Sequence, residues 1–230
     1  AQAAEGLIRM IAKREGFGDV LAEGLKVTAE KVGGMASEYA VQMNNMALPA
    51  HDPRAYASLA LVYATSPRGP CHTSAFTFWF ERAATFPELG IDKVLDRFQS
   101  EGKPEIVMNI QNAVSVWENL CLCKFSILGG VQMKDICSWL KDVVGWDFST
   151  QEFLEVGERG INLKRKLNVG WGMSRKNDTL PLRILTHRVD DGGCGRHLPP
   201  FNIMLADYYE KRGWNKEGIP TEETIKRLNI

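Results

Sequence analysis

Apolar residues along the chain recur at the three- and four-residue spacing of helix faces, and no stretch alternates apolar and polar residues as a half-buried strand does. Together with capping residues, this spacing predicts helices in nine stretches: residues 7–15, 18–32, 53–63, 91–98, 104–117, 133–144, 150–167, 201–212 and 221–228. Residues 38–46 are predicted as an extended connector, and residues 169–200 as a long surface loop with one short apolar segment. The pattern therefore predicts an all-α, multihelical fold.

Several of these helices are predicted from their ends as well as from their spacing. Asp52 and Pro53 are good cap and first-turn residues, Pro104 suits a first turn, and Ser149 with Glu152 forms a capping box. The helix after this box is expected to bury one face, made of Phe153, Val156, Gly160, Leu163 and Leu167. Glycine in mid-helix costs about 1 kcal/mol relative to alanine. Gly157 and Gly160 therefore indicate that another helix approaches closely.

Composition places the chain among globular proteins. With 230 residues and 44% hydrophobic residues it can bury a substantial core. Its 28 basic residues balance its 28 acidic residues, which argues against nucleic acid or an anionic membrane surface as a partner. No apolar run is long enough to span a membrane and the first residues lack a signal-peptide layout, so a cytoplasmic protein is expected.

The five cysteines form an odd, scattered set that is unlike a disulfide framework, and they are compatible with buried thiols or one metal ligand. Cys121 and Cys123 lie where the helix from Pro104 should end. In a regular helix Glu118 and Cys123 would point about 140° apart, so both can face one site only if the helix breaks between them. Without further information, two core thiols are the simpler explanation, because free cysteine is among the most buried residue types.

Histidines provide the other candidate chemistry. His72 follows a rigid loop over residues 67–70, where it could be either a hydrogen-bonded loop histidine or a proton-transfer group. Arg68 is explained equally well as a surface residue or as an anion contact. His51, just before a predicted helix, is expected to be structural. His187, Cys194 and His197 lie in the long loop without the spacing or the fourth ligand of a zinc site.

Several ordered segments resemble one known family. They cover residues 14–24, 48–54, 63–69, 157–162, 178–181 and 208–214, together with the Arg68-Gly69-x-x-His72 segment and the run from Glu118 to Cys123. These segments are similar to the C-terminal half of the aldehyde ferredoxin oxidoreductases, which are tungsten-pterin and iron-sulfur enzymes. The resemblance implies two all-helical regions, residues 1–102 and 103–230, and an N-terminal domain cradling the pterin that this sequence does not contain.

The resemblance also implies roles for individual residues. Cys123 would ligate a [4Fe-4S] cluster, and Glu118 and Leu122 would lie against a pterin. His72 would handle protons beside the metal, and Ser74 would occupy a pterin-contacting position. Three positions depart from the family pattern, because Glu118 replaces Asp, Cys121 replaces Gly and Ser74 replaces a basic residue. The Cys-x-x-Cys-x-x-x-Cys set that would give the other three cluster ligands is not in this sequence.

The implied activity of the complete protein is oxidation of aldehydes to carboxylic acids at a tungsten or molybdenum bis-pterin, with electrons leaving through the cluster to ferredoxin. Its partners would be the N-terminal domain, ferredoxin and the aldehyde, and a homodimer is compatible with this scheme. This chain by itself is expected to bind no cofactor and to be inactive. Two alternatives remain open: a non-catalytic helical module used for protein contact, and a related tungsten enzyme with another substrate, such as an aromatic ring.

Overall fold

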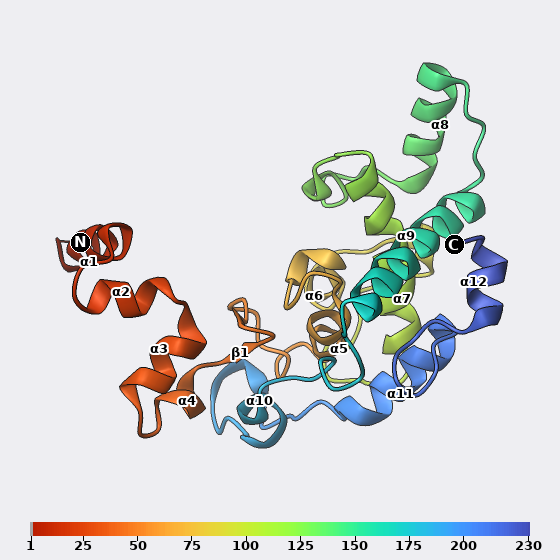
Figure 1. The fold of residues 1–230 in the computed structure, drawn as a ribbon. Helices are drawn as coiled ribbons and strands as arrows, with labels where there is room; N and C mark the ends of the chain where they lie inside the picture. The colour runs from red at the N-terminus through yellow and green to blue at the C-terminus, as the bar shows by residue number, and fades with distance from the viewer. Residues whose placement is uncertain (1) are drawn as a thin grey trace.

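The computed structural model describes residues 2–230, and it is built from helices joined by long loops (Figure 1). The α-helices are α1 (Gln2–Lys13), α2 (Phe17–Ala22), α3 (Leu25–Val32), α4 (Ala36–Tyr39), α5 (Ser58–Thr65), α6 (Thr77–Phe80), α7 (Lys103–Asn119), α8 (Met133–Val144), α9 (Thr150–Gly170), α10 (Leu182–Thr186), α11 (Phe201–Arg212) and α12 (Glu222–Leu228). Four 3-10 turns are η1 (His72–Ser74), η2 (Pro87–Leu89), η3 (Lys124–Ser126) and η4 (Gly192–Cys194). The predicted all-α fold is confirmed.

The only strands among residues 2–230 are β1 (Gln42–Met43) and β2 (Met46–Ala47), which form a two-residue antiparallel hairpin. The predicted extended connector over residues 38–46 is therefore wrong in detail, because its backbone folds back on itself at Asn44 and Asn45, both with positive φ. Within the same residues, no helix is both long and apolar enough to cross a membrane.

Helices α1 to α4 form an arm that extends away from the rest of the molecule (Figure 1). The predicted single helix over residues 18–32 is two helices, because α2 ends at Ala22 and Gly24, with a φ of 90°, separates it from α3. Gly18 packs directly on α1, and a Cβ added there would lie 2.3 Å from the carbonyl carbon of Met10. The arm is thus held by backbone contact between α1 and α2, while none of the residues of α1 is buried.

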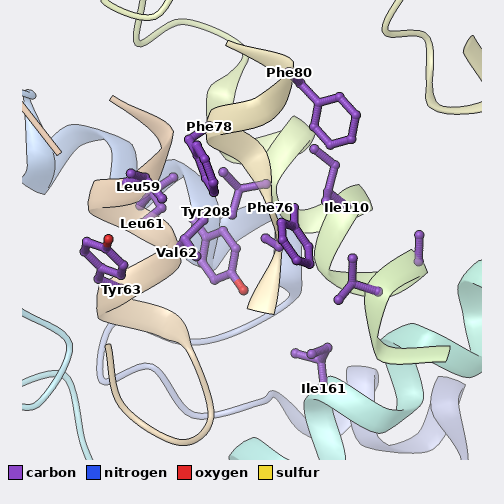
Figure 2. Close-up of a cluster of buried hydrophobic side chains, with 14 of the residues drawn as sticks. Leu59, Leu61, Val62, Tyr63, Phe76, Phe78, Phe80, Ile110, Ile161 and Tyr208 are labelled. Atoms are coloured by element: carbon purple, nitrogen blue, oxygen red, sulfur yellow. The ribbon is translucent and has the colours of Figure 1, made fainter. Parts of the chain in front are cut away.

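The core of the molecule surrounds α5, every residue of which is buried. Aromatic and aliphatic side chains from α5, α6, α7 and α11 meet there, including Leu59, Phe78, Ile110 and Tyr208 (Figure 2). The hydrophobic cluster is continuous across residues 102 and 103, since α7 packs against α5. Division into regions 1–102 and 103–230 stays a prediction, and the two regions share one core.

Two helix predictions around this core are wrong. Asp52 does not cap α5, which begins at Ser58, because the Asp52 carboxylate binds the guanidinium and backbone N–H of Arg54. Residues 91–98 form no helix: Ile91 pairs with Phe86, and the N–H of Leu95 donates to the carbonyl of Phe80. In both places the backbone finds partners outside the local helix.

Helices α7 and α9 pack so closely that their backbones touch. A Cβ on Gly157 would lie 1.9 Å from the carbonyl oxygen of Asn112, and one on Gly160 would lie 2.8 Å from the Oγ of Ser115. This confirms the close approach that the glycines predicted. The predicted face of α9 is wrong in part, because Leu163 and Leu167 are 46% and 51% exposed. The buried residues of α9 are Phe153, Gly157, Ile161, Asn162 and Arg165.

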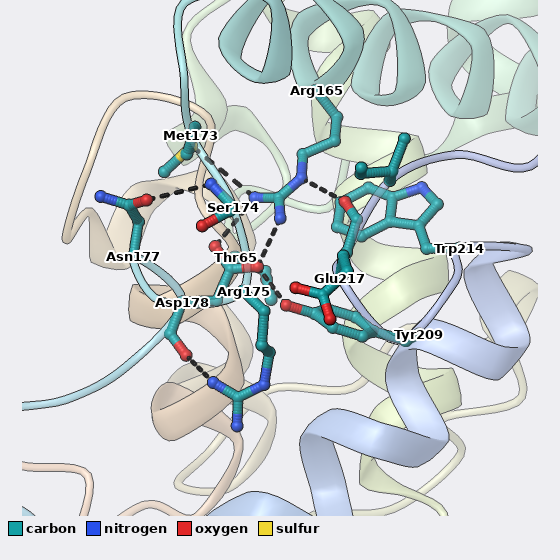
Figure 3. A network of polar contacts seen from close by, with 12 residues as sticks. Thr65, Arg165, Met173, Ser174, Arg175, Asn177, Asp178, Tyr209, Trp214 and Glu217 are labelled. Atoms are coloured by element: carbon teal, nitrogen blue, oxygen red, sulfur yellow. Dashed lines mark hydrogen bonds and ion pairs between the residues drawn. The ribbon is translucent and has the colours of Figure 1, made fainter.

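Arg165, on the buried face of α9, anchors the long loop that follows this helix (Figure 3). Its guanidinium donates two hydrogen bonds to the carboxylate of Asp178, at 2.8 and 2.6 Å, and both side chains are buried. The hydroxyl of Tyr209 on α11 donates to the same carboxylate. A bidentate buried pair is stabilising only while both partners remain, so this contact fixes where the loop leaves α9.

Candidate functional site

The site begins where α7 ends. The helix stops at Asn119, and the N–H groups of Cys121 and Leu122 donate to the carbonyls of Glu118 and Trp117, closing the last turn. Cys121 is left-handed, with a φ of 55°, and Cys123 is extended. The chain thus breaks between Glu118 and Cys123, as their predicted convergence requires.

The left-handed conformation of Cys121 explains why a glycine suits this position. A residue with a Cβ is strained at positive φ, whereas glycine adopts it freely. We predict that Cys121→Gly stabilises the protein by up to about 1 kcal/mol, because relief of strain exceeds the added chain entropy of glycine. Thermal and denaturant unfolding would measure the change. Cys123→Gly, at a φ of −67°, is the matched control and should destabilise; stabilisation by both substitutions would contradict the argument.

A cleft of about 790 Å³ lies beside this break. Residues from four parts of the chain line it, and they include Arg68, Ser74, Glu118, Leu122, Cys123, Lys124, Lys164 and Trp171. Four of the five predicted site residues, Ser74, Glu118, Leu122 and Cys123, therefore share one cavity. Cys123 is an exposed thiol. The structure brings these residues together even though the loop with Ser74 and α7 are far apart in sequence.

Glu118 is held at this cleft by two lysines. One carboxylate oxygen accepts from Lys124 and the other from Lys164 of α9 at 3.0 Å. Burial alone would raise the pKa of Glu118, but these hydrogen bonds and charges outweigh burial and lower it below its ordinary value. Lys124 also donates to the carbonyl of Thr73 at 2.9 Å, which ties the turn after Cys123 to the loop that carries His72. The sequence reasoning missed both lysines, since neither belongs to a motif.

His72 begins η1 but does not line the cleft, although its neighbours Thr73 and Ser74 do. Its ring stacks on that of His51, with centroids 4.5 Å apart. Burial lowers the pKa of His72, and the charges of His51, Arg68 and Lys124 lower it further. Burial and these charges therefore favour the neutral imidazole. The expectation that His51 is only structural did not anticipate this pairing.

Ser74 is a buried residue whose hydroxyl donates to the carbonyl of Cys71 at 2.9 Å. Its hydroxyl therefore supports the turn, and the residue is also part of the cleft lining. Cys71 is a further residue that sequence reasoning missed. Its sulfur lies 2.9 Å from a guanidinium nitrogen of Arg68 and 3.1 Å from the Thr73 hydroxyl. Burial would raise the pKa of the Cys71 thiol, but hydrogen bonds from Thr73 and Arg68 lower it overall.

This arrangement supplies few metal ligands of its own. Across residues 2–230, no group of three or more His, Cys, Asp and Glu side chains is placed to hold a metal ion. The cleft does offer polar groups that a bound molecule could satisfy. Ser66 and Ser115 line it and are buried, and the hydroxyl of each lacks a hydrogen-bond partner. Together with Arg68, Lys124 and Lys164, these hydroxyls make the cleft suited to a polar, anionic molecule. The exposed thiol of Cys123 could supply one ligand to a metal bound beside it.

Comparison with known proteins gives consistent matches over the whole chain. The family model described as aldehyde ferredoxin oxidoreductase, domains 2 & 3, matches residues 1–230. The tungsten-containing aldehyde ferredoxin oxidoreductases of Pyrococcus horikoshii and Pyrococcus abyssi are 38% and 37% identical over 226 residues. Those matches cover 97% of this chain and 36% of each relative. The chain therefore spans about a third of the length of the curated relatives it matches.

More distant proteins share the same region. The WOR-like subunit of aliphatic sulfonate oxidoreductase from Pyrococcus furiosus is 26% identical over 239 residues, covering 97% of this chain and 34% of the relative. A solved structure, the active site complex BamBC of benzoyl coenzyme A reductase in complex with 1,5-dienoyl-CoA, aligns with a TM-score of 0.65. It is 19% identical and covers 97% of this chain and 38% of that chain, so this likeness concerns the fold alone. The chain belongs to the aldehyde ferredoxin oxidoreductase family and corresponds to the C-terminal portion of such an oxidoreductase.

Proposed function

We propose that this chain forms the C-terminal wall of a tungsten bis-pterin site, in an enzyme that oxidises aldehydes to carboxylic acids and passes the electrons to ferredoxin. One observation carries the proposal: the break after α7 sets Glu118 and Cys123 on a single cleft with Ser74 and Leu122. Supporting it, the curated relatives at 37–38% identity are named as tungsten-containing aldehyde ferredoxin oxidoreductases.

The residues of the cleft fit a pterin. A pterin ring carries N–H groups and carbonyls, and Glu118 accepts hydrogen bonds while Lys124 and Lys164 donate them. The cations Arg68, Lys124 and Lys164 outnumber the single carboxylate among the lining residues, which suits the phosphates of such a cofactor. Leu122 and Trp171 add apolar surface beside these groups.

Cys123 fits an iron-sulfur cluster as one ligand of four. Its thiol is exposed, and its backbone is extended where the chain passes from the end of α7 into η3. A [4Fe-4S] cluster takes four cysteine thiolates. The remaining three would come from outside this sequence, so Cys123 joins the helical part of the enzyme to the part that holds the cluster.

In this scheme the bound cofactor would supply the redox chemistry, and the protein would orient the cofactor and move protons to and from the substrate. The two lysines favour the ionised form of Glu118, which would accept hydrogen bonds from the N–H groups of a pterin. Burial favours the neutral form of His72, which stands beside the cleft-lining Thr73 and Ser74 and could accept a proton from water or substrate there and return it. Lys124 links the two, since it binds Glu118 and the carbonyl of Thr73 next to His72.

Metal and cofactor analysis of the complete enzyme tests this function. We expect tungsten, pterin and cluster iron to copurify with the protein, and reduction of ferredoxin to depend on an added aldehyde. The chain lacking its cluster-bearing partner region should give neither signal. A complete protein free of tungsten, pterin and iron would instead support a helical module used only for protein contact.

A further inference from the structure

The loop before α5 and the turn η1 bring two histidines face to face. The rings of His51 and His72 are stacked at 4.5 Å between centroids and 27° between planes. Phe78 of α6 lies against both, 4.2 Å from His51 and 5.9 Å from His72. Such a contact fixes the orientation of each imidazole by packing on its flat face.

Neither ring is oriented by a hydrogen bond at Nδ1. The Nδ1 atoms of His51 and His72 are both buried and without a partner, and the Nε1 of Trp79 nearby is in the same condition. An imidazolium donates from both nitrogens, so a charged ring here would bury a donor with no acceptor. Two positive rings stacked at 4.5 Å would also repel each other. The geometry therefore favours two neutral rings, and it opposes a second proton once one is bound.

The charged groups around the pair reinforce this effect. Besides burial, the charge of Arg82 lowers the pKa of His51, and the charges of Arg68 and Lys124 lower the pKa of His72. All three groups are cations, so they disfavour a proton on either ring. The carboxylate of Asp52 is next to His51 in sequence but is bound by Arg54. The remaining polar contact is to the backbone, where the Tyr63 hydroxyl donates to the carbonyl of His51 at 2.8 Å.

We propose that His51 is a positioning residue for His72: the stacked imidazoles bind at most one proton between them, and His51 thereby sets the proton affinity of His72. This inference rests on the proposed function for its role in the reaction, but the coupling is a property of these two rings. His51 holds the ring plane of His72, and it disfavours the imidazolium form, so His72 stays available as a base at more acidic pH.

Histidine NMR titration of the 230-residue chain tests the coupling directly, because the chain contains four histidines. Signals are assigned by single substitution. In the unsubstituted protein His72 should titrate over a broader pH range than a single site does. In His51→Phe and His51→Tyr, which keep an aromatic ring without the charge, the His72 curve should sharpen and its midpoint should rise. Coupling is reciprocal, so His72→Phe should change the His51 curve in the same sense.

The matched control is His197→Phe, because His197 also has a buried Nδ1 without a partner but packs on Phe98 and not on either ring of the pair. It should leave the His72 curve unchanged. Identical His72 curves in the unsubstituted, His51→Phe and His51→Tyr proteins would overturn the proposal, and so would a His51 curve that ignores His72→Phe. Circular dichroism establishes that each variant is folded before it is compared.

The pH dependence of turnover separates this proposal from the proposed function. If neutral His72 is the base, activity falls as pH drops through its pKa. Removing His51 raises that pKa, so the acid limb of turnover should move to higher pH in His51→Phe of the complete enzyme. If the NMR curves were coupled but the acid limb of turnover did not move in His51→Phe, the coupling between His51 and His72 would stand. The role of His72 as the base in the reaction would then be overturned.

Discussion

Replacing Cys123 by serine in the complete enzyme is expected to remove most of the cluster iron and, with it, nearly all electron transfer to ferredoxin. Thiolates bind iron-sulfur clusters far better than serine hydroxyls, and a cluster with one missing ligand is open to water. The helical fold should persist, because Cys123 is exposed and contributes no core packing. Iron content, the visible absorbance of the cluster and the far-ultraviolet circular dichroism measure these three quantities.

Cys121→Ser is the matched control for this experiment. Cys121 is also an exposed thiol that lines the same cleft, two residues earlier in the chain. It should keep its iron and its electron transfer. If Cys121→Ser lost iron while Cys123→Ser kept it, the cluster ligand would be Cys121 and not Cys123. Unchanged iron in both variants would show that neither cysteine binds the cluster.

Replacing His72 by alanine in the complete enzyme is expected to lower turnover by roughly 10² or more, with metal and pterin still bound. A neutral imidazole can both accept and donate a proton, and burial together with nearby cations holds His72 in that form. Alanine removes proton transfer without touching Glu118 or Cys123. Turnover per metal-loaded molecule, together with tungsten and pterin content, measures the effect.

His187→Ala is the control, since the side chain of His187, at the end of α10, makes no ring contact or hydrogen bond with His51, His72 or Phe78. Its turnover should match that of the unsubstituted enzyme. A His72 that only stabilises its loop would behave differently: alanine would lower the melting temperature through loss of the His51 and Phe78 contacts, and turnover per folded molecule would hardly change. That result would leave the family membership intact and withdraw the proton-transfer role.

The helices that the sequence predicted well combine helical spacing of apolar residues with capping or first-turn residues at their ends. Pro104 lies in the first turn of α7, the Ser149 and Glu152 capping box starts α9, and α8 and α11 have the predicted bounds. These signals act within a few residues, so tertiary contacts rarely override them. The motif around Glu118 and Cys123 was recognised through its resemblance to the family, whereas the residue pattern alone favoured two core thiols, and both thiols are exposed.

Predictions that depended on distant partners were less successful. Residues 91–98 have helical spacing, yet Ile91 and Leu95 bond to Phe86 and Phe80 instead. On α9 the buried face is turned toward Gly157 and Arg165, because contact with α7 and the buried pair with Asp178 select it. Apolar spacing alone did not identify a face whose central members are glycine, asparagine and arginine.

By itself, then, the sequence determined an all-helical chain of this family, with a thiol and a carboxylate at the end of one helix, since spacing, caps and motifs are local properties. Only the tertiary structure decided what surrounds them. Lys164 of α9 binds Glu118, which is 46 residues earlier in the sequence. His51 stacks on His72 although the buried helix α5 lies between them in the sequence. Such contacts form between segments that the chain brings together by burying apolar surface, and no local pattern records them.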